Sequence, residues 1–70
     1  MQAMTPQAYL AALRAAGVSM KQTDARIDAE AGRLLRIARS TAWNYRNGKR
    51  PIPGPVAVAL MALGRRKENA

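Results

Sequence analysis

The sequence predicts an all-α fold, a compact bundle of four to five helices. Apolar residues recur at the three- and four-residue spacing of a helix face along successive segments. Glycine and proline separate these segments, and no stretch of any length alternates apolar and polar residues as a half-buried strand would. Seventy residues make one domain with a small core, so we expect one unit over residues 1–64 and a frayed, basic polar tail over 65–70.

The first helix is expected over residues 6–16. Thr5 is a favourable N-cap, and Pro6 suits the first helical position, where no backbone N–H is needed. Gly17 is a typical residue just past the end of a helix.

The second helix is expected over about residues 20–35, either as one helix or as two shorter ones. Ser19 and Gln22 have the spacing of a capping box, which places the start near Met20. Gly32 lowers the helix propensity of this segment, so a glycine there indicates that another helix approaches closely.

The last two helices are separated by a stiff connector. The third is expected over residues 39–47, ended by Gly48, and the fourth starts at Pro55 and is stopped by Gly64. The expected core is made of apolar residues at helical spacing, namely Leu10, Leu13, Met20, Ile27, Leu34, Leu35, Leu60 and Leu63, together with Ala42 and Tyr45. Trp43 is left open between the core and an exposed face of the third helix.

The charge is strongly positive and unevenly distributed. The chain has 12 Lys and Arg against 4 Asp and Glu, a formal net charge of +8. From Ala31 to Lys67 there are nine basic residues and no acidic one, whereas Asp24, Asp28 and Glu30 lie just upstream. Such a field attracts polyanions such as nucleic acids.

Several classes of protein are disfavoured by composition. The chain has no cysteine, which excludes disulfides and thiolate metal sites, and no histidine, the commonest general base and metal ligand. The neighbouring acidic residues belong to one helix that we expect to be solvated. We therefore expect no enzyme, no metal, no cofactor and no small-molecule substrate. No apolar run is long enough to span a membrane, and the N-terminus lacks the pattern of a secretion signal, so we expect a cytoplasmic protein without a membrane partner.

Residues 31–51, AGRLLRIARSTAWNYRNGKRP, resemble the helix-turn-helix of the lambda-repressor/Cro-like family of DNA-binding regulators. Gly32 matches the small residue where the two helices of that motif touch. The family's apolar positions fall on Leu35, Ile37, Ala42 and Tyr45, and its glycine, basic residues and proline fall on residues 48–51. The resemblance covers residues 5–64, is strongest over 31–60, and is closest to small members from phages and mobile elements.

The resemblance implies a recognition helix over about 39–47 that lies in the major groove of double-stranded DNA. Base contacts would come from Arg39, Ser40, Trp43 and Asn44, which also share one face by helical geometry. Arg39 suits a guanine and Asn44 an adenine. Phosphate contacts would come from Arg36, Thr41, Arg46, Asn47, Lys49 and Arg50. The family suggests a repressor in the bacterial cytoplasm or nucleoid that binds a palindromic operator as a homodimer, and the apolar fourth helix is the expected dimer surface.

Two features depart from the family. The turn reads Arg36-Ile37-Ala38 where the family usually has Gly-Val-Ser, so the third helix lacks a capping side chain and its start is open between Arg39 and Ser40. The family's phosphate-binding glutamine falls on Asp28, which would repel phosphate. We read the segment 19–30 as an N-terminal extension of the second helix.

Three alternatives remain open on the sequence. Another register would make residues 20–27 the first helix of the motif. The domain could instead be a protein-interaction module, such as an antitoxin or a phage factor that binds a host protein, or a nonspecific binder of nucleic acid.

Overall fold

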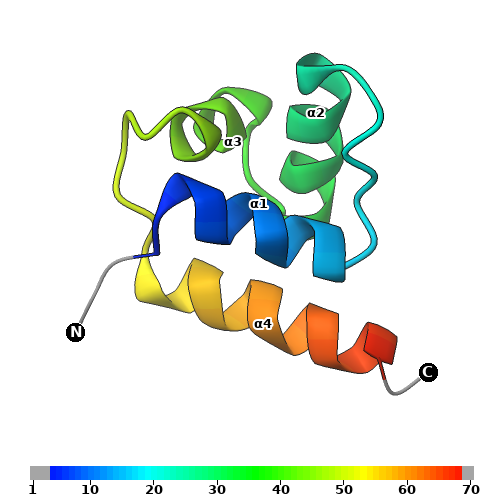
Figure 1. The fold of residues 1–70 in the computed structure, drawn as a ribbon. Helices are drawn as coiled ribbons and strands as arrows, with labels where there is room; N and C mark the ends of the chain where they lie inside the picture. Colours follow the sequence, from blue (N-terminus) through cyan, green and yellow to red (C-terminus); the bar gives the residue numbers. More distant parts are fainter. Residues whose placement is uncertain (1–3, 69–70) are drawn as a thin grey trace.

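A computed structural model describes residues 4–68, with side chains up to residue 67. Within these residues the chain forms four helices, α1 (Pro6–Ala15), α2 (Asp24–Leu35), α3 (Arg39–Arg46) and α4 (Gly54–Glu68) (Figure 1). No strand occurs in the described part, where an isolated bridge ties Met4 to Ile52 in the α3–α4 connection. The all-α prediction is confirmed, with four helices in residues 4–68.

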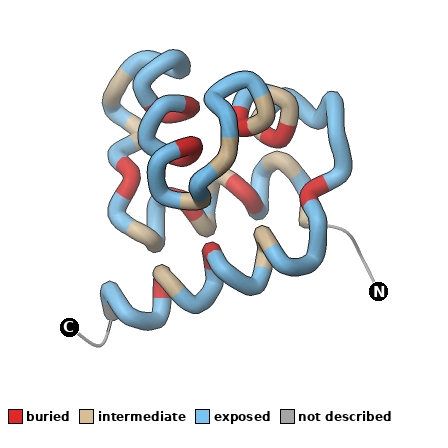
Figure 2. Tube along the Cα trace, turned by 180° about the vertical axis from the view of Figure 1, so that it is seen from behind, coloured by how far each residue is buried: buried red, intermediate tan, exposed pale blue. Residues whose placement is uncertain are grey.

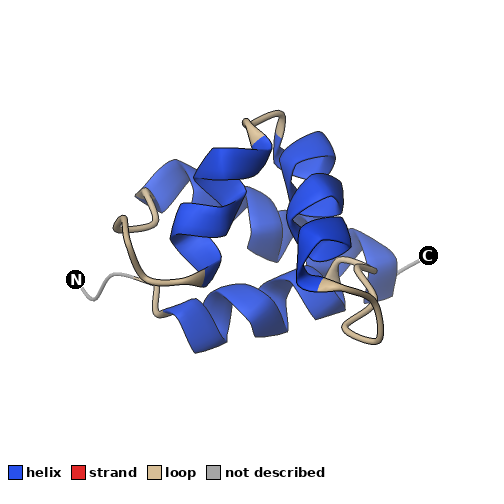
Figure 3. Cartoon of the chain, turned by 90° about the horizontal axis from the view of Figure 1, so that it is seen from above, coloured by secondary structure: helices blue, strands red, loops and turns tan. Residues whose placement is uncertain are grey.

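The helices enclose one core. In Figure 1, α1 lies between α4 on one side and the α2–α3 pair on the other. Seen from above, short loops at the edge of the bundle connect the helices (Figure 3). α3 lies against both α2 and α1, whereas α4 packs mainly on α1.

The core is small and centred on α1. Its buried apolar residues come from all four helices and two loops (Figure 2): Tyr9, Leu13, Val18, Ile27, Ala31, Ala42, Tyr45, Ile52 and Leu60. The rings of Tyr9 and Tyr45 meet edge to face with centroids 6.0 Å apart, a favourable arrangement of two aromatic quadrupoles.

Most of the predicted core is confirmed in whole or in part. Leu13, Ile27, Ala42, Tyr45 and Leu60 are buried. The predicted residues Leu10, Met20, Leu35 and Leu63 are only half-buried.

Leu34 was wrongly assigned to the core. The Leu34 side chain is 36% exposed. The neighbouring side of α2 turns toward α3, and Leu34 is left at the edge of an open groove between α2 and the α1–α2 loop.

The signals at both ends of α1 work as predicted. The Thr5 hydroxyl accepts a hydrogen bond from the Ala8 amide at 3.1 Å. Gly17 has φ +102°, in the left-handed region that favours glycine, and its amide donates to the Arg14 carbonyl. The helix ends one residue earlier than predicted.

The predicted start of α2 is wrong. The helix begins at Asp24, where the Thr23 hydroxyl accepts from the Arg26 amide at 3.3 Å. Ser19 instead accepts from the Lys21 amide in a local turn. Val18 is buried and Met20 packs half-buried against the core, so the chain follows the core as a loop through residues 18–22 before it turns into α2. These residues are not helical, which also removes the alternative register with its first motif helix over 20–27.

α4 starts at Gly54 rather than Pro55 and continues through Gly64 to Glu68, so residues 65–68 are not a frayed tail. Residues 69–70 lie outside the described part. Gly64 is buried, and a Cβ added there would lie 3.3 Å from the Cβ of Ala15. The glycine therefore allows close packing of α4 on α1 and does not stop the helix.

Candidate nucleic-acid interface

A tight turn joins α2 to α3. Arg36 ends α2 in the left-handed conformation at φ 57°, and the amides of Arg36 and Ile37 both donate to the Gly32 carbonyl. This arrangement satisfies a carbonyl at the helix end in the manner of a Schellman motif. An arginine thus adopts a left-handed conformation that glycine would take without strain.

Gly32 lies where the turn crosses α2. A Cβ there would lie 2.8 Å from the Ile37 carbonyl oxygen and 3.5 Å from the Arg39 amide nitrogen. The predicted close approach is confirmed, but the nearest atoms belong to the turn and only one to the first residue of α3. The contact fixes where α3 begins relative to α2.

α3 begins at Arg39, although its first turn has no side-chain cap. Ala38 takes the extended conformation of an N-cap, but no side chain accepts a hydrogen bond from the first amides. At the other end Gly48 has φ +70°, and the Lys49 amide donates to the Asn44 carbonyl at 2.8 Å. The predicted glycine stop is confirmed, and the open question of the helix start is settled at Arg39.

The predicted base-contacting residues share the side of α3 that points away from the core. Arg39, Ser40 and Trp43 are exposed and Asn44 is half-buried. The indole of Trp43 is 44% exposed, so Trp43 is no core residue. Ala42 and Tyr45 point the opposite way, into the core.

An open groove of about 750 Å³ runs between the first turns of α2 and the exposed side of α3. It is lined by Asp24, Ala25, Asp28, Arg39, Ser40, Trp43 and Arg46. Carboxylates therefore form one wall of the groove, and two arginines, a serine and an indole form the other.

Arg46 and Asp28 form a buried ion pair across the two helices. Arg46 Nε donates to Asp28 Oδ1 at 2.8 Å and Nη2 donates to Oδ2 at 3.0 Å. The side chains are 14% and 4% exposed, and Asp24 approaches Arg46 Nη1 at 3.5 Å. The hydrogen bonds to Asp28 raise the pKa of Arg46 above its usual range.

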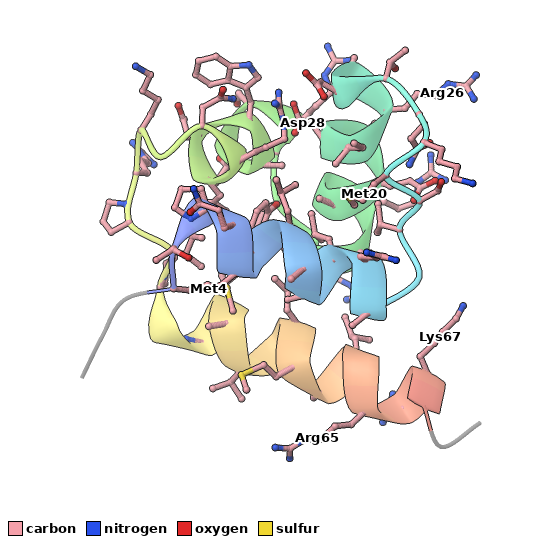
Figure 4. All side chains as sticks on the ribbon, in the orientation of Figure 1. Met4, Met20, Arg26, Asp28, Arg65 and Lys67 are labelled. Atoms are coloured by element: carbon pink, nitrogen blue, oxygen red, sulfur yellow. The ribbon has the colours of Figure 1, made fainter. Side chains whose placement is uncertain are left out.

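This ion pair corrects two predictions. Arg46 is engaged inside the protein, so we remove it from the phosphate-contacting set. Asp28 is not solvated and does not point at a phosphate. It lies inside the α2–α3 contact, where its charge is paired (Figure 4).

The other phosphate candidates differ in how available they are. Arg36, Lys49 and Arg50 are exposed, with Arg36 just before α3 and the other two just after it. Thr41 is half-buried. The Asn47 side chain donates to the Trp43 carbonyl at 2.9 Å, so one of its amide hydrogens already serves the end of α3.

Tyr9, which no sequence pattern singled out, lies in the core beneath the site. Its side chain is fully buried, and its hydroxyl has no hydrogen-bond partner among the described residues. Burial, aided by the negative charge of Asp28, raises the pKa of Tyr9 to about 12. The only signal in the sequence was the position of Tyr9 beside the apolar stripe of the first helix.

None of the described helices has the length and apolar character that a membrane crossing requires. No protein-family model, no curated protein and no solved structure matches the chain.

Proposed function

We propose that this domain binds double-stranded DNA in a sequence-specific manner, with α3 in the major groove. The observation that carries the proposal is the outward side of α3. It presents Arg39, Ser40, Trp43 and Asn44 together, while the opposite side of the same helix is fixed in the core. A helix used in this way needs its polar side free and its position rigid.

The chemistry of these side chains fits base edges. Arg39 can donate two hydrogen bonds to a guanine, and Asn44 can donate to and accept from an adenine. Each such pair discriminates against a wrong base by about 1–3 kcal/mol. The exposed indole of Trp43 suits apolar contact with a thymine methyl group.

Basic side chains are available at both ends of α3 for the DNA backbone. Arg36 precedes the helix, and Lys49 and Arg50 follow it. Phosphate contacts of this kind fix the register of a domain on DNA without reading its sequence. The Arg46–Asp28 pair and the contact at Gly32 support the proposal further, because they hold α3 rigidly against α2.

A repressor that binds a palindrome as a homodimer remains part of the proposal, but α4 is a poor choice for its dimer surface. In a two-fold symmetric dimer, the contacting surfaces of the two copies face each other. The surface on the far side of each copy therefore points away from the partner, and the two far surfaces point in opposite directions. The outer side of α4 and the outer side of α3 lie on opposite sides of α1 (Figure 1). A dimer through α4 would turn its two α3 helices apart, whereas reading one palindrome requires them to face the same duplex.

Selection of binding sites from a random duplex library, followed by fluorescence anisotropy, tests the proposal. A shared sequence motif should be enriched. Arg39→Ala and Asn44→Ala should each relax the preference at one position of this motif. Lys49→Ala should weaken all sequences alike and reduce the slope of log affinity against log salt by about 0.9.

Arg14→Ala is the matched control, because it removes the same charge from the exposed surface of α1. It should change affinity much less than Lys49→Ala. If no motif is enriched and all these variants weaken every sequence equally, the assignment of α3 as the reading helix is wrong.

A further inference from the structure

The outer side of α4 carries an apolar surface that the proposed function does not use. Val58 and Met61 are 66% and 53% exposed, although both are large apolar side chains. Arg65 follows one turn after Met61 and points away from the other helices (Figure 4). Single exposed apolar residues are common, but these share one side of one helix.

Next to them, a groove of about 270 Å³ runs between α1 and α4. It is lined by Ala12, Ala15, Leu60, Met61, Gly64 and Arg65. Three of these six residues are small, so a third helix could bring its backbone close to the floor of the groove at those positions. We call the groove, together with Val58, the α1–α4 face.

The charge of the α1–α4 face has one sign. α1 contains no acidic residue, and the one acidic residue in the sequence of α4 is its last, Glu68. Arg65 lines one end of the face, and Arg66 is the next exposed residue of α4. An apolar groove with cations at one end is complementary to a helix that carries apolar residues on one side and carboxylates beside them.

We propose that the α1–α4 face docks an acidic amphipathic helix of a partner protein. The apolar side of this helix would cover Val58 and Met61, and its carboxylates would pair with Arg65 and Arg66. The proposal does not depend on DNA binding. Because α3 lies on the other side of α1, the two surfaces could be occupied at once (Figure 1).

Charge argues against a second copy of this chain as the occupant. Each copy carries a net charge of +8, so two copies repel each other, and the lining of the groove offers no carboxylate to pair with Arg65 of a second copy. DNA also fits poorly, because the exposed apolar side chains of the face offer nothing to phosphates.

The test uses two synthetic helical peptides of about 18 residues. Both carry leucine on one side; the first has glutamate at the remaining positions and the second has lysine. Two-dimensional NMR of the full chain should show that the glutamate peptide shifts the amide signals of Ala12, Met61 and Gly64, whereas the lysine peptide does not.

Variants separate docking on this face from general attraction to a basic protein. Met61→Glu and Arg65→Glu should each weaken the glutamate peptide about tenfold. Leu34→Glu is the control, because it changes an exposed apolar residue of α2 and should weaken the peptide much less. Circular dichroism should give the same helix content for all three variants.

The proposal is overturned if the peptide shifts only α3 and its flanking loops, or if both peptides bind this face equally. It is also overturned if the signals of the α1–α4 face depend on protein concentration without any peptide, which would identify a second copy as the occupant.

Discussion

Tyr9 carries the most unusual polar group of the core, a hydroxyl with no partner among the described residues. A buried donor left unpaired costs about 1–3 kcal/mol. Tyr9→Phe should therefore raise the free energy of unfolding at neutral pH by about 1 kcal/mol, which corresponds to about 4–8 °C in Tm for a domain of this size. Thermal and urea unfolding followed by circular dichroism measure both quantities.

The same residue predicts a dependence of stability on pH. The pKa of Tyr9 is about 12 in the folded protein against 10.0 for an ordinary tyrosine. A raised pKa gives stability that is present in full below pH 10, because both states are then protonated. This stability is lost as the pH rises through the pKa of Tyr9 in the folded protein, because the Tyr9 hydroxyl ionises at a lower pH in the unfolded chain. The loss amounts to at most about 3 kcal/mol.

Urea unfolding from about pH 8 to about pH 11 should show this decline in the natural protein and a smaller one in Tyr9→Phe. Tyr45→Phe, which removes the other core hydroxyl, should keep most of the decline. If both variants change the pH profile to the same extent, Tyr9 is not its source.

Asp28 and Arg46 should depend strongly on each other. Arg46→Met leaves the nearly buried carboxylate of Asp28 without its main partner and should cost about 3 kcal/mol of unfolding free energy. The double variant Asp28→Leu/Arg46→Met replaces the pair with apolar groups and should recover most of this loss. Urea denaturation of the two variants decides the question, and a single-variant cost below about 1 kcal/mol would mean that the pair is solvated.

This pair also marks the limit of the sequence at the residue scale. Asp28 and Arg46 are 18 positions apart, so no spacing rule for a single helix links them. Local patterns did predict that Ala42 and Tyr45 face the core and that the side of α3 with Arg39 and Asn44 does not. That Asp28 of α2 pairs with Arg46 of α3 follows only from the way in which the two helices cross.

Among the elements, α2 and the turn that follows it are in close contact at Gly32. Gly32→Ala would place a methyl group 2.8 Å from the Ile37 carbonyl oxygen, an atom of the backbone that cannot move aside cheaply. We expect a loss of about 1–3 kcal/mol, despite the better helix propensity of alanine. Gly54→Ala is the matched control, because a Cβ there meets nothing within 4 Å. Unfolding experiments should find the control within about 0.5 kcal/mol of the natural protein, and equal losses would refute the close contact.

The uncapped start of α3 offers an opposite prediction, a gain of stability. Ala38 already has the backbone conformation of an N-cap, so Ala38→Ser adds the missing acceptor and should stabilise the fold by about 1 kcal/mol. Ala29→Ser introduces serine at an exposed position within α2 and should instead lower stability slightly. Thermal unfolding distinguishes the two, and a loss in both variants would show that residue 38 is not the cap.

Helix ends were predictable where one local signal acted alone, as at Thr5, Gly17 and Gly48. They were not predictable where tertiary packing chose between two signals. Ser19 and Thr23 are both good caps, and the burial of Val18 decides in favour of Thr23. Gly64 looks like a stop, but its contact with Ala15 makes it part of a helix crossing.

Over the whole molecule, α1 separates two surfaces of different chemistry. The polar and basic side of α3 lies on one side of α1, and the apolar outer side of α4 lies on the other (Figure 1). The net charge of +8 alone would attract DNA to any part of such a protein. The net charge alone therefore does not identify a specific DNA-binding site. Such a site is identified by a position where a change of charge alters the affinity for DNA more than the same change does elsewhere.

Asp24 and Glu30 allow this distinction to be tested, since each can lose one negative charge by an isosteric change. Asp24 is exposed at the wall of the groove beside Arg39, whereas Glu30 lines a different groove with the α1–α2 loop. Asp24→Asn should raise the affinity for duplex DNA about threefold at physiological salt, because its carboxylate lies beside the side of α3 that is proposed to face the DNA. Glu30→Gln gives the same net charge but lies on another side of α2, so most of its effect should be screened over the Debye length of about 8 Å at physiological salt.

Fluorescence anisotropy across a salt series measures the affinity of both variants for DNA. Equal gains from the two variants would mean that DNA responds only to total charge, and the groove beside α3 would then have no claim to be the binding site.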